Sequence, residues 1–255
     1  MRTLFLDCSP KRKNSTSSYL MWHVKVAIKG KKEKMKVLPK NYNAIIEKLS
    51  EVDTLVLSMP VYVDGVPGSV LEFLCVVEEK IKEKNLNLKV YVISNCGFYE
   101  GKQNRNSLAI IENWCTRCNI KYMGGLGVGA GEMFGIIRFF NVALAFTIAF
   151  IQFLVGSIVL LVNKSFTFMG ALSYISIINI CVNIGLIFVF NTLMYISMAK
   201  LSRSIKKERK VANFYTTVLC PRFLFVIFAD LFWIIKALVR GVPIWKMYKK
   251  NKIEQ

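Results

Sequence analysis

The sequence predicts a parallel α/β sheet followed by a pair of membrane-spanning helices. Over residues 1–130, short apolar runs alternate with helical patterns. Two long runs without charge follow, Phe139–Asn163 and Ser165–Ala199, and a basic segment, KLSRSIKKERK, comes after them. Alternating strands and helices are typical of a parallel sheet. Each uncharged run exceeds the ~20 apolar residues that cross a bilayer.

Five strands are expected in the first half of the chain. The clearest is Asp53–Met59, a continuous apolar run typical of a strand covered on both faces. The run GKKEKMK (30–36) is interpreted as a solvated turn. The five expected strands cover Thr3–Leu6, Met35–Leu38, Asp53–Met59, Leu88–Ser94 and Ile120–Val128.

Four helices are expected between these strands. Ser15–Lys29 has Asn14 or Ser15 as its N-cap, and Pro67 suits the first position of the third helix. The second helix is Tyr42–Leu49. The fourth presents one apolar face, made of Leu108, Ile111, Cys115 and Cys118. This spacing favours packing as the role of the two cysteines, with a redox or metal role as the alternative. The single histidine, His23, is expected to pack or lie on the surface.

The two uncharged runs predict a transmembrane helical hairpin, with spans at about 139–162 and 171–198. The positive-inside rule places the basic segment and the α/β domain in the cytoplasm and the short loop NKSFTFMG outside. We therefore expect a multi-pass protein of the cell membrane. The alternative is a pair of buried helices in a soluble core. No signal peptide is expected, because Met1–Leu6 is short and Asp7 interrupts it.

The last part of the chain, 201–255, is expected to be a basic cytoplasmic segment that contains a helix at 221–240. At 100° per residue, its charged residues and Trp233 fall on about one third of the circumference, and the rest is apolar. This pattern favours a helix lying in the membrane interface, with a third span as the alternative. The expected organisation is thus 1–134 (α/β domain), 135–200 (hairpin) and 201–255.

Charge and cysteine content restrict the class of protein. Residues 1–134 carry 20 Lys and Arg against 13 Asp and Glu, whereas residues 135–255 carry 15 against 3. A half that is both apolar and basic suits contact with anionic lipid, and no nucleic-acid motif accompanies it, so no nucleic-acid partner is expected. Seven scattered cysteines fit a reducing compartment.

Three loops follow strands of the predicted sheet and converge at its carboxyl edge, where parallel sheets bind ligands. The first, in DCSPKRKNSTSSYL (7–20), is rich in hydroxyls and leads into a helix N-terminus. It can bind a phosphate, or it can simply cap the helix beside a solvated basic turn. The other two are SMPVYVDGVPGSV (58–70) and SNCGFYEGKQ (94–103). Together they suggest a flat cofactor with a phosphate tail.

These loops resemble those of the flavodoxin-like NAD(P)H-dependent FMN reductases. The first loop matches with Cys8-Ser9-Pro10-Lys11 and Ser15-Thr16-Ser17, the second with Pro60-Val61-Tyr62, and the third with Asn95-Cys96-Gly97-Phe98. GGLGVGAGE (124–132) is similar to the family's last strand, so the resemblance covers about residues 2–133. Cys8 replaces the family's usual Gly, and Lys11 replaces Arg, which keeps the charge but loses the bidentate fork.

The resemblance implies a flavodoxin-like sheet of order 2-1-3-4-5 with bound FMN and NAD(P)H as co-substrate. The phosphate would lie against Ser9, Lys11, Ser15, Thr16 and Ser17. Backbone groups of Pro60, Val61, Tyr62, Val63, Asn95, Gly97 and Phe98 would surround the ring. No metal is expected, because one histidine and scattered cysteines leave little material for a metal site. Relatives that hold an iron–sulfur cluster carry closely spaced cysteines after the first helix, and residues 24–74 contain no Cys, so no cluster is expected.

The expected function is a membrane-anchored, FMN-dependent NAD(P)H oxidoreductase. Hydride passes directly from nicotinamide to flavin, so no catalytic side chain is assigned. The electron acceptor is expected to be lipophilic or membrane-bound, such as a quinone or a redox partner in the bilayer, and the resemblance favours a homodimer. The competing hypotheses are a flavodoxin-type electron carrier and a non-catalytic scaffold on the membrane.

Overall fold

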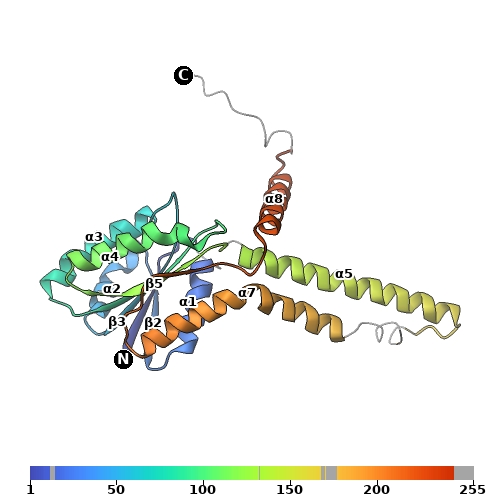
Figure 1. The fold of residues 1–255 in the computed structure, drawn as a ribbon, viewed down its shortest axis with the longest axis horizontal. Coiled ribbons are helices and arrows are strands. Elements are labelled where there is room, and N and C mark those ends of the chain that lie inside the picture. Colours follow the sequence, from blue (N-terminus) through green and yellow to red (C-terminus); the bar gives the residue numbers. More distant parts are fainter. Residues whose placement is uncertain (12–14, 132, 168–169, 171–176, 244–255) are drawn as a thin grey trace, which may run out of the picture.

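Six parallel strands form one sheet in the computed structural model of this protein, in the order β2-β1-β3-β4-β5-β6 (Figure 1). The structure describes the whole chain except residues 12–14, 132, 168–169, 171–176 and 244–255. The strands are β1 (Arg2–Asp7), β2 (Lys31–Lys36), β3 (Thr54–Pro60), β4 (Lys89–Asn95), β5 (Lys121–Val128) and β6 (Phe214–Thr216).

Seven α-helices and two 3₁₀ turns are described. The helices are α1 (Thr16–Ala27), α2 (Tyr42–Leu49), α3 (Gly68–Glu83), α4 (Arg105–Arg117), α5 (Met133–Val162), α7 (Ile177–Lys206) and α8 (Arg222–Val239), and the turns are η1 (Pro39–Asn41) and η2 (Gly101–Asn104). The four predicted helices of the first half are confirmed. Ser15 is the N-cap of α1, and Pro67 is the N-cap of α3 rather than its first residue.

One strand lies where the sequence indicated a turn. The Lys-rich run 31–36 is the edge strand β2, so both the solvated turn and the strand at Met35–Leu38 were wrong. Among the described residues this strand pairs with β1 alone, and its side chains are exposed or half-buried. Lysines are common on edge strands because they discourage pairing with other chains. Because its side chains are not fully buried, this strand can form without an apolar sequence pattern.

Alternate residues of the central strands fill two separate core layers. Leu55 and Leu57 point to the face covered by α2, α3 and α4, whereas Val56 points to the face covered by α1 and α7. Cys115 and Cys118 lie in the first layer, as expected from their spacing. Burial raises the pKa of both thiols, to about 11 for Cys118. Neutral buried thiols are poor nucleophiles, which supports the packing role.

The C-terminal half of α7 belongs to the α/β domain. Met194, Met198, Leu201 and Ile205 are fully buried against the sheet and α1. The Tyr195 hydroxyl lies 3.2 Å from that of Tyr19 on α1. The predicted second span, 171–198, therefore ends too late: its last residues pack in a protein core, which an apolar helix can do as readily as it can enter lipid.

A short sixth strand follows α7 and completes the sheet. β6 pairs with β5, and the amide of Val211 donates to the carbonyl of Met123 (2.8 Å). Gly124 makes this approach possible, since a Cβ there would lie 2.0 Å from the Val211 carbonyl oxygen. The α/β domain therefore does not end at the predicted boundary, residue 134. Residues from about 191 to 220 return to the domain after the helical pair.

Helices α5 and α7 leave the α/β domain side by side as a long projection (Figure 1). Within the described residues, one helix is long and apolar enough to cross a membrane: α5 carries an 18-residue stretch, Ala145–Val162, with a mean hydropathy of 2.5. Large apolar side chains such as Phe146, Phe150 and Ile158 are exposed on it. The second predicted span begins in residues that lie outside the described part of the chain.

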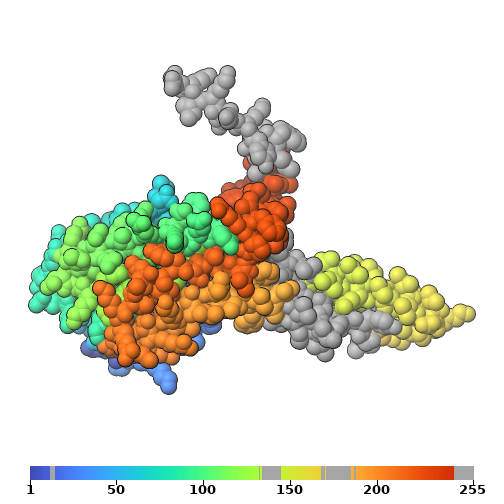
Figure 2. All heavy atoms as spheres, viewed as in Figure 1, coloured from blue at the N-terminus to red at the C-terminus, as the bar shows by residue number. Residues whose placement is uncertain are grey.

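Helix α8 occupies the segment in which an interfacial helix was expected. It is apolar and largely exposed, and it extends crosswise to α5 (Figure 1). Figure 2 shows α8 against the part of the α/β domain that follows β4.

Candidate functional site

The three predicted loops meet at Asn95, the last residue of β4. The Ser17 hydroxyl from the start of α1 donates to Asn95 Oδ1 (2.7 Å). The amide of Val61, which follows β3, donates to the Asn95 carbonyl (2.8 Å). The third loop begins with the next residue, Cys96. A single buried asparagine therefore joins the loops after β1, β3 and β4 at the carboxyl edge of the sheet.

The hydroxyl groups of Ser15, Thr16 and Ser17 form hydrogen bonds with other groups of the same chain. Ser15 caps α1 by accepting from the amide of Ser18 (3.1 Å). Thr16 donates to the carbonyl of Gly131 (3.1 Å), and Ser17 donates to Asn95. These side chains hold the loop and the helix start in place, which is a different role from the direct phosphate contact expected for them.

Backbone amides are the donors that the start of α1 offers. The amides of Ser18 and Tyr19 are bonded to Ser15, whereas those of Thr16 and Ser17 have no acceptor among the described residues. Such amides, together with the helix dipole, attract anions. On the loop itself, Ser9 is buried and its Oγ accepts from the amide of Lys11 (3.3 Å).

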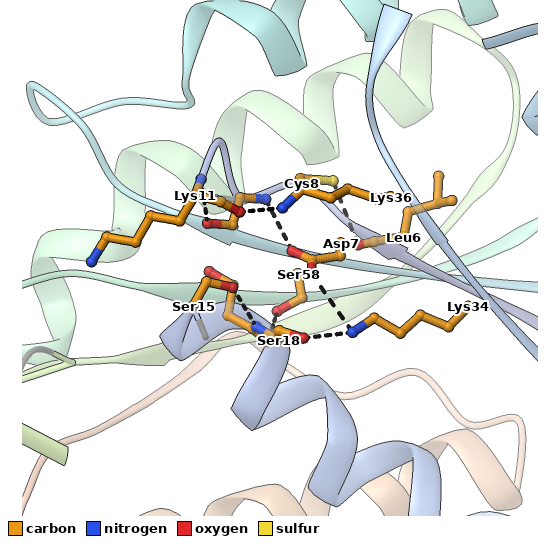
Figure 3. Close-up of polar contacts among 11 residues, drawn as sticks. Leu6, Asp7, Cys8, Lys11, Ser15, Ser18, Lys34, Lys36 and Ser58 are labelled. Carbon is orange, nitrogen blue, oxygen red and sulfur yellow. Dashed lines mark hydrogen bonds and ion pairs between the residues drawn. The ribbon is translucent and has the colours of Figure 1, made fainter. Parts of the chain in front are cut away.

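Two lysines from the edge strand reach this loop, and the sequence interpretation missed them. Lys34 Nζ lies 3.7 Å from Asp7 Oδ2 and donates to Ser18 Oγ, while Lys36 donates to the carbonyl of Lys11 (Figure 3). Residues 34 and 36 share one face of β2 because side chains alternate along a strand. Lys34 also offsets the charge of Asp7, a buried carboxylate beside the loop.

Cys8 does not obstruct the loop. Its side chain is buried in the core layer that includes Leu6 and Met59, and its Sγ lies 3.6 Å from the Leu6 carbonyl (Figure 3). Burial raises the pKa of this thiol, with Asp7 adding to the effect. Cys8, at the position where the similar reductases usually have Gly, therefore fills the protein interior.

The second loop is a tight turn that exposes an aromatic ring. Pro60 is buried at the end of β3, and Tyr62 and Gly65 exchange two backbone hydrogen bonds of 3.0 and 3.1 Å. Val63 stands in the turn with a φ of 49° and a fully exposed side chain. A β-branched residue is unfavourable in this conformation, and such strain is frequent in ligand-binding loops. Tyr62 is 43% exposed.

The third loop exposes a second aromatic ring and is tied to the end of the chain. Phe98 is 59% exposed, and Gly97 beside it is also exposed. Tyr99 donates from its hydroxyl to the carbonyl of Cys220 (2.7 Å), and its own carbonyl accepts from the Thr217 hydroxyl (2.5 Å). The segment between β6 and α8 therefore fixes this loop, a contact that no local pattern in the sequence indicates.

The arrangement can bind a flat molecule with a phosphate. It combines amides at a helix start, two nearby lysines and exposed rings on two loops. Strand order β2-β1-β3-β4-β5 with loops at the carboxyl edge defines the flavodoxin-like doubly wound fold, whose ligand lies at the switch point between β1 and β3. The loops after these two strands are the ones described here.

Comparisons with known proteins find only solved structures of low similarity. No family model matches the chain, and no curated protein matches it. Solved structures that match include the Trp repressor binding protein from Bacillus subtilis (15% identity, 50% of this chain and 84% of that chain, TM-score 0.42). Another is an NAD(P)H:quinone oxidoreductase from Methanothermobacter marburgensis (13% identity, 51% of this chain and 84% of that chain, TM-score 0.43). The assignment of the fold rests on the strand order rather than on these likenesses.

Proposed function

We propose that this protein is an FMN-dependent NAD(P)H oxidoreductase held at the cytoplasmic face of the cell membrane. The observation that carries the proposal is the meeting of the three loops at Asn95, whose side chain and carbonyl are bonded to Ser17 and Val61. The convergence lies at the switch point of the sheet, where doubly wound folds bind their ligands. The NAD(P)H part of the proposal rests on the resemblance of the loop motifs.

The described groups fit a mononucleotide better than a dinucleotide. The start of α1 offers two amides that have no acceptor among the described residues, and Lys34 and Lys36 reach the loop before it, which suits one phosphate group. The sequence of the first loop has no G-x-G-x-x-G, the pattern that brings a backbone close to a pyrophosphate. The exposed rings of Tyr62 and Phe98 stand on the neighbouring loops and can contact a flat ring system. When bound, FMN would supply the hydride chemistry.

The projecting helices support the membrane part of the proposal. The apolar stretch Ala145–Val162 is about 27 Å long as a helix, close to the ~30 Å of a bilayer core. A single soluble domain rarely leaves so much apolar surface uncovered. Because Asn191 and later residues of α7 are packed on the α/β domain, the returning span would end near residue 190.

Release of the cofactor from purified protein tests this proposal. The full chain, extracted in mild detergent, is expected to release FMN that mass spectrometry identifies after denaturation. A second sample is first incubated with added FMN to fill empty sites. Release of FAD or NAD, or no bound flavin even after incubation, would contradict the proposal.

A further inference from the structure

A groove of about 480 Å³ lies between α8 and the loop after β4, next to the candidate flavin site. One face of α8 lines it with Phe225, Ala229 and Trp233. The opposite wall includes Gly97 and Phe98. Because these two residues are also part of the third loop, the groove is continuous with the place proposed for the flavin ring. Its size is ordinary for a pocket that holds a small organic molecule.

The groove combines an aromatic lining with a few polar groups. The rings of Phe98, Phe225 and Trp233 provide flat apolar surfaces. Arg222 and Gln103 add hydrogen-bond donors, and Arg222 forms an exposed ion pair with Glu100 (3.6 Å). An uncharged aromatic molecule with carbonyl oxygens matches this lining, because rings contact its faces and the donors bind its oxygens.

The position of the groove favours a ligand that is dissolved in the membrane. Met133, the first residue of α5, lines it, and only about 9 Å of helix separates Met133 from the predicted start of the span at Phe139. The other face of α8 exposes Ile227, Leu231 and Leu238, which suits contact with lipid. If α5 spans the bilayer from Phe139 onward, a molecule leaving the bilayer near the start of α5 would be close to the groove.

We propose that this groove binds the lipophilic electron acceptor, a quinone whose planar head lies among the rings and whose apolar chain extends toward the bilayer. The inference rests on the proposed oxidoreductase function and deepens it by assigning the acceptor a site of its own. The site is built by α8, a segment outside the part of the chain that resembles flavin reductases.

Filling the groove tests this inference. In Ala229→Trp, a large side chain replaces one of the smallest that line the groove. Ala237→Trp is the matched control, because it lies on the same helix but outside the lining. Binding of a long-chain ubiquinone is measured by quenching of intrinsic fluorescence, with the full chain in phosphatidylcholine–phosphatidylglycerol nanodiscs. We expect the dissociation constant to rise about tenfold in Ala229→Trp and to stay unchanged in Ala237→Trp.

Two outcomes would overturn the inference. One is equal binding of ubiquinone by both variants. The other is equal competition by a single-chain detergent that has no quinone head, which would make the groove a site for lipid chains. The binding measurement does not depend on flavin or on NAD(P)H. The flavin content of the same samples therefore shows separately whether the proposed function has failed.

Discussion

At the scale of single residues, Asn95 is the position on which the candidate site depends. Its side chain is buried, and it receives the Ser17 hydroxyl while its carbonyl receives the amide of Val61. The loops after β1 and β3 are thereby held at a fixed distance across the switch point of the sheet. A change at Ser17 should affect both the stability of the fold and the binding of a ligand.

Ser17→Ala is expected to lower the free energy of unfolding by about 1–3 kcal/mol, because Asn95 Oδ1 is left buried without this donor. FMN affinity should fall as well, since the loops lose their connection. Thr116→Ala is the matched control: that hydroxyl is bonded to the carbonyl of Glu112 in its own helix and is exposed. Denaturant unfolding measures the free energy of unfolding of each variant, and flavin titration measures its FMN affinity. Equal values of both quantities in the two variants would contradict the role of Ser17.

Lys34 and Lys36 are expected to act on the phosphate of FMN rather than on its ring. The double change to Ala should weaken FMN about tenfold, an effect that salt reduces. Riboflavin, which has no phosphate, should bind the variant and the unchanged protein equally well. Lys31→Ala, at the other end of β2, is the control. Equal losses for FMN and riboflavin would show that the lysines merely support the loop.

At the scale of elements, the strands with apolar runs and the loops after them could be predicted from sequence. Burial forces β3 and β4 to be continuously apolar, and the direction of parallel strands puts their loops at one edge. The edge strand β2 could not be predicted, because it has little surface to bury. The bonding of the Ser17 hydroxyl to Asn95, 78 residues away, has no local pattern either.

The role of α7 shows a different limit of sequence patterns. An uncharged helical run suits both lipid and a protein core. Helix α7 carries no charge up to Ala199, yet it provides buried side chains from residue 191 onward. β6 has only three residues and follows a basic segment, so its pattern is too short to indicate a strand. The α/β domain therefore needs residues on both sides of the helical projection.

Removal of the projection alone should leave a folded domain. A variant in which a short Gly-Ser linker replaces residues 134–189 retains Met194, Met198 and β6. We expect it to be soluble, to unfold cooperatively and to bind FMN. A chain that ends at Gly131 lacks these core residues and should be unfolded. Thermal unfolding followed by circular dichroism, and flavin titration, are measured for the linker variant and for the chain ending at Gly131. Cooperative unfolding of the chain ending at Gly131 would contradict this account of α7.

At the scale of the whole molecule, the proposed hairpin gives the chain a definite orientation. Lys200, Arg203 and Lys206 near the end of α7 favour the cytoplasmic side, and the α/β domain would then lie on that side too. Single cysteines introduced at Ser165 and Ser204, in a chain without other cysteines, report the orientation. A membrane-impermeant maleimide added to intact cells should label position 165 and not 204. Labelling of position 204 would place the domain outside.

The absorption spectrum of the full protein, before and after NADH or NADPH, is the most direct test of the central claim. The sample is kept in detergent under argon, after incubation with FMN and removal of the excess. The protein should then show the two absorption bands of an oxidised flavin, which the cofactor supplies. Either nicotinamide should bleach the longer-wavelength band, and a lipophilic quinone should restore it. A bound flavin that neither nicotinamide bleaches would indicate an electron carrier. A protein without flavin bands would contradict the account.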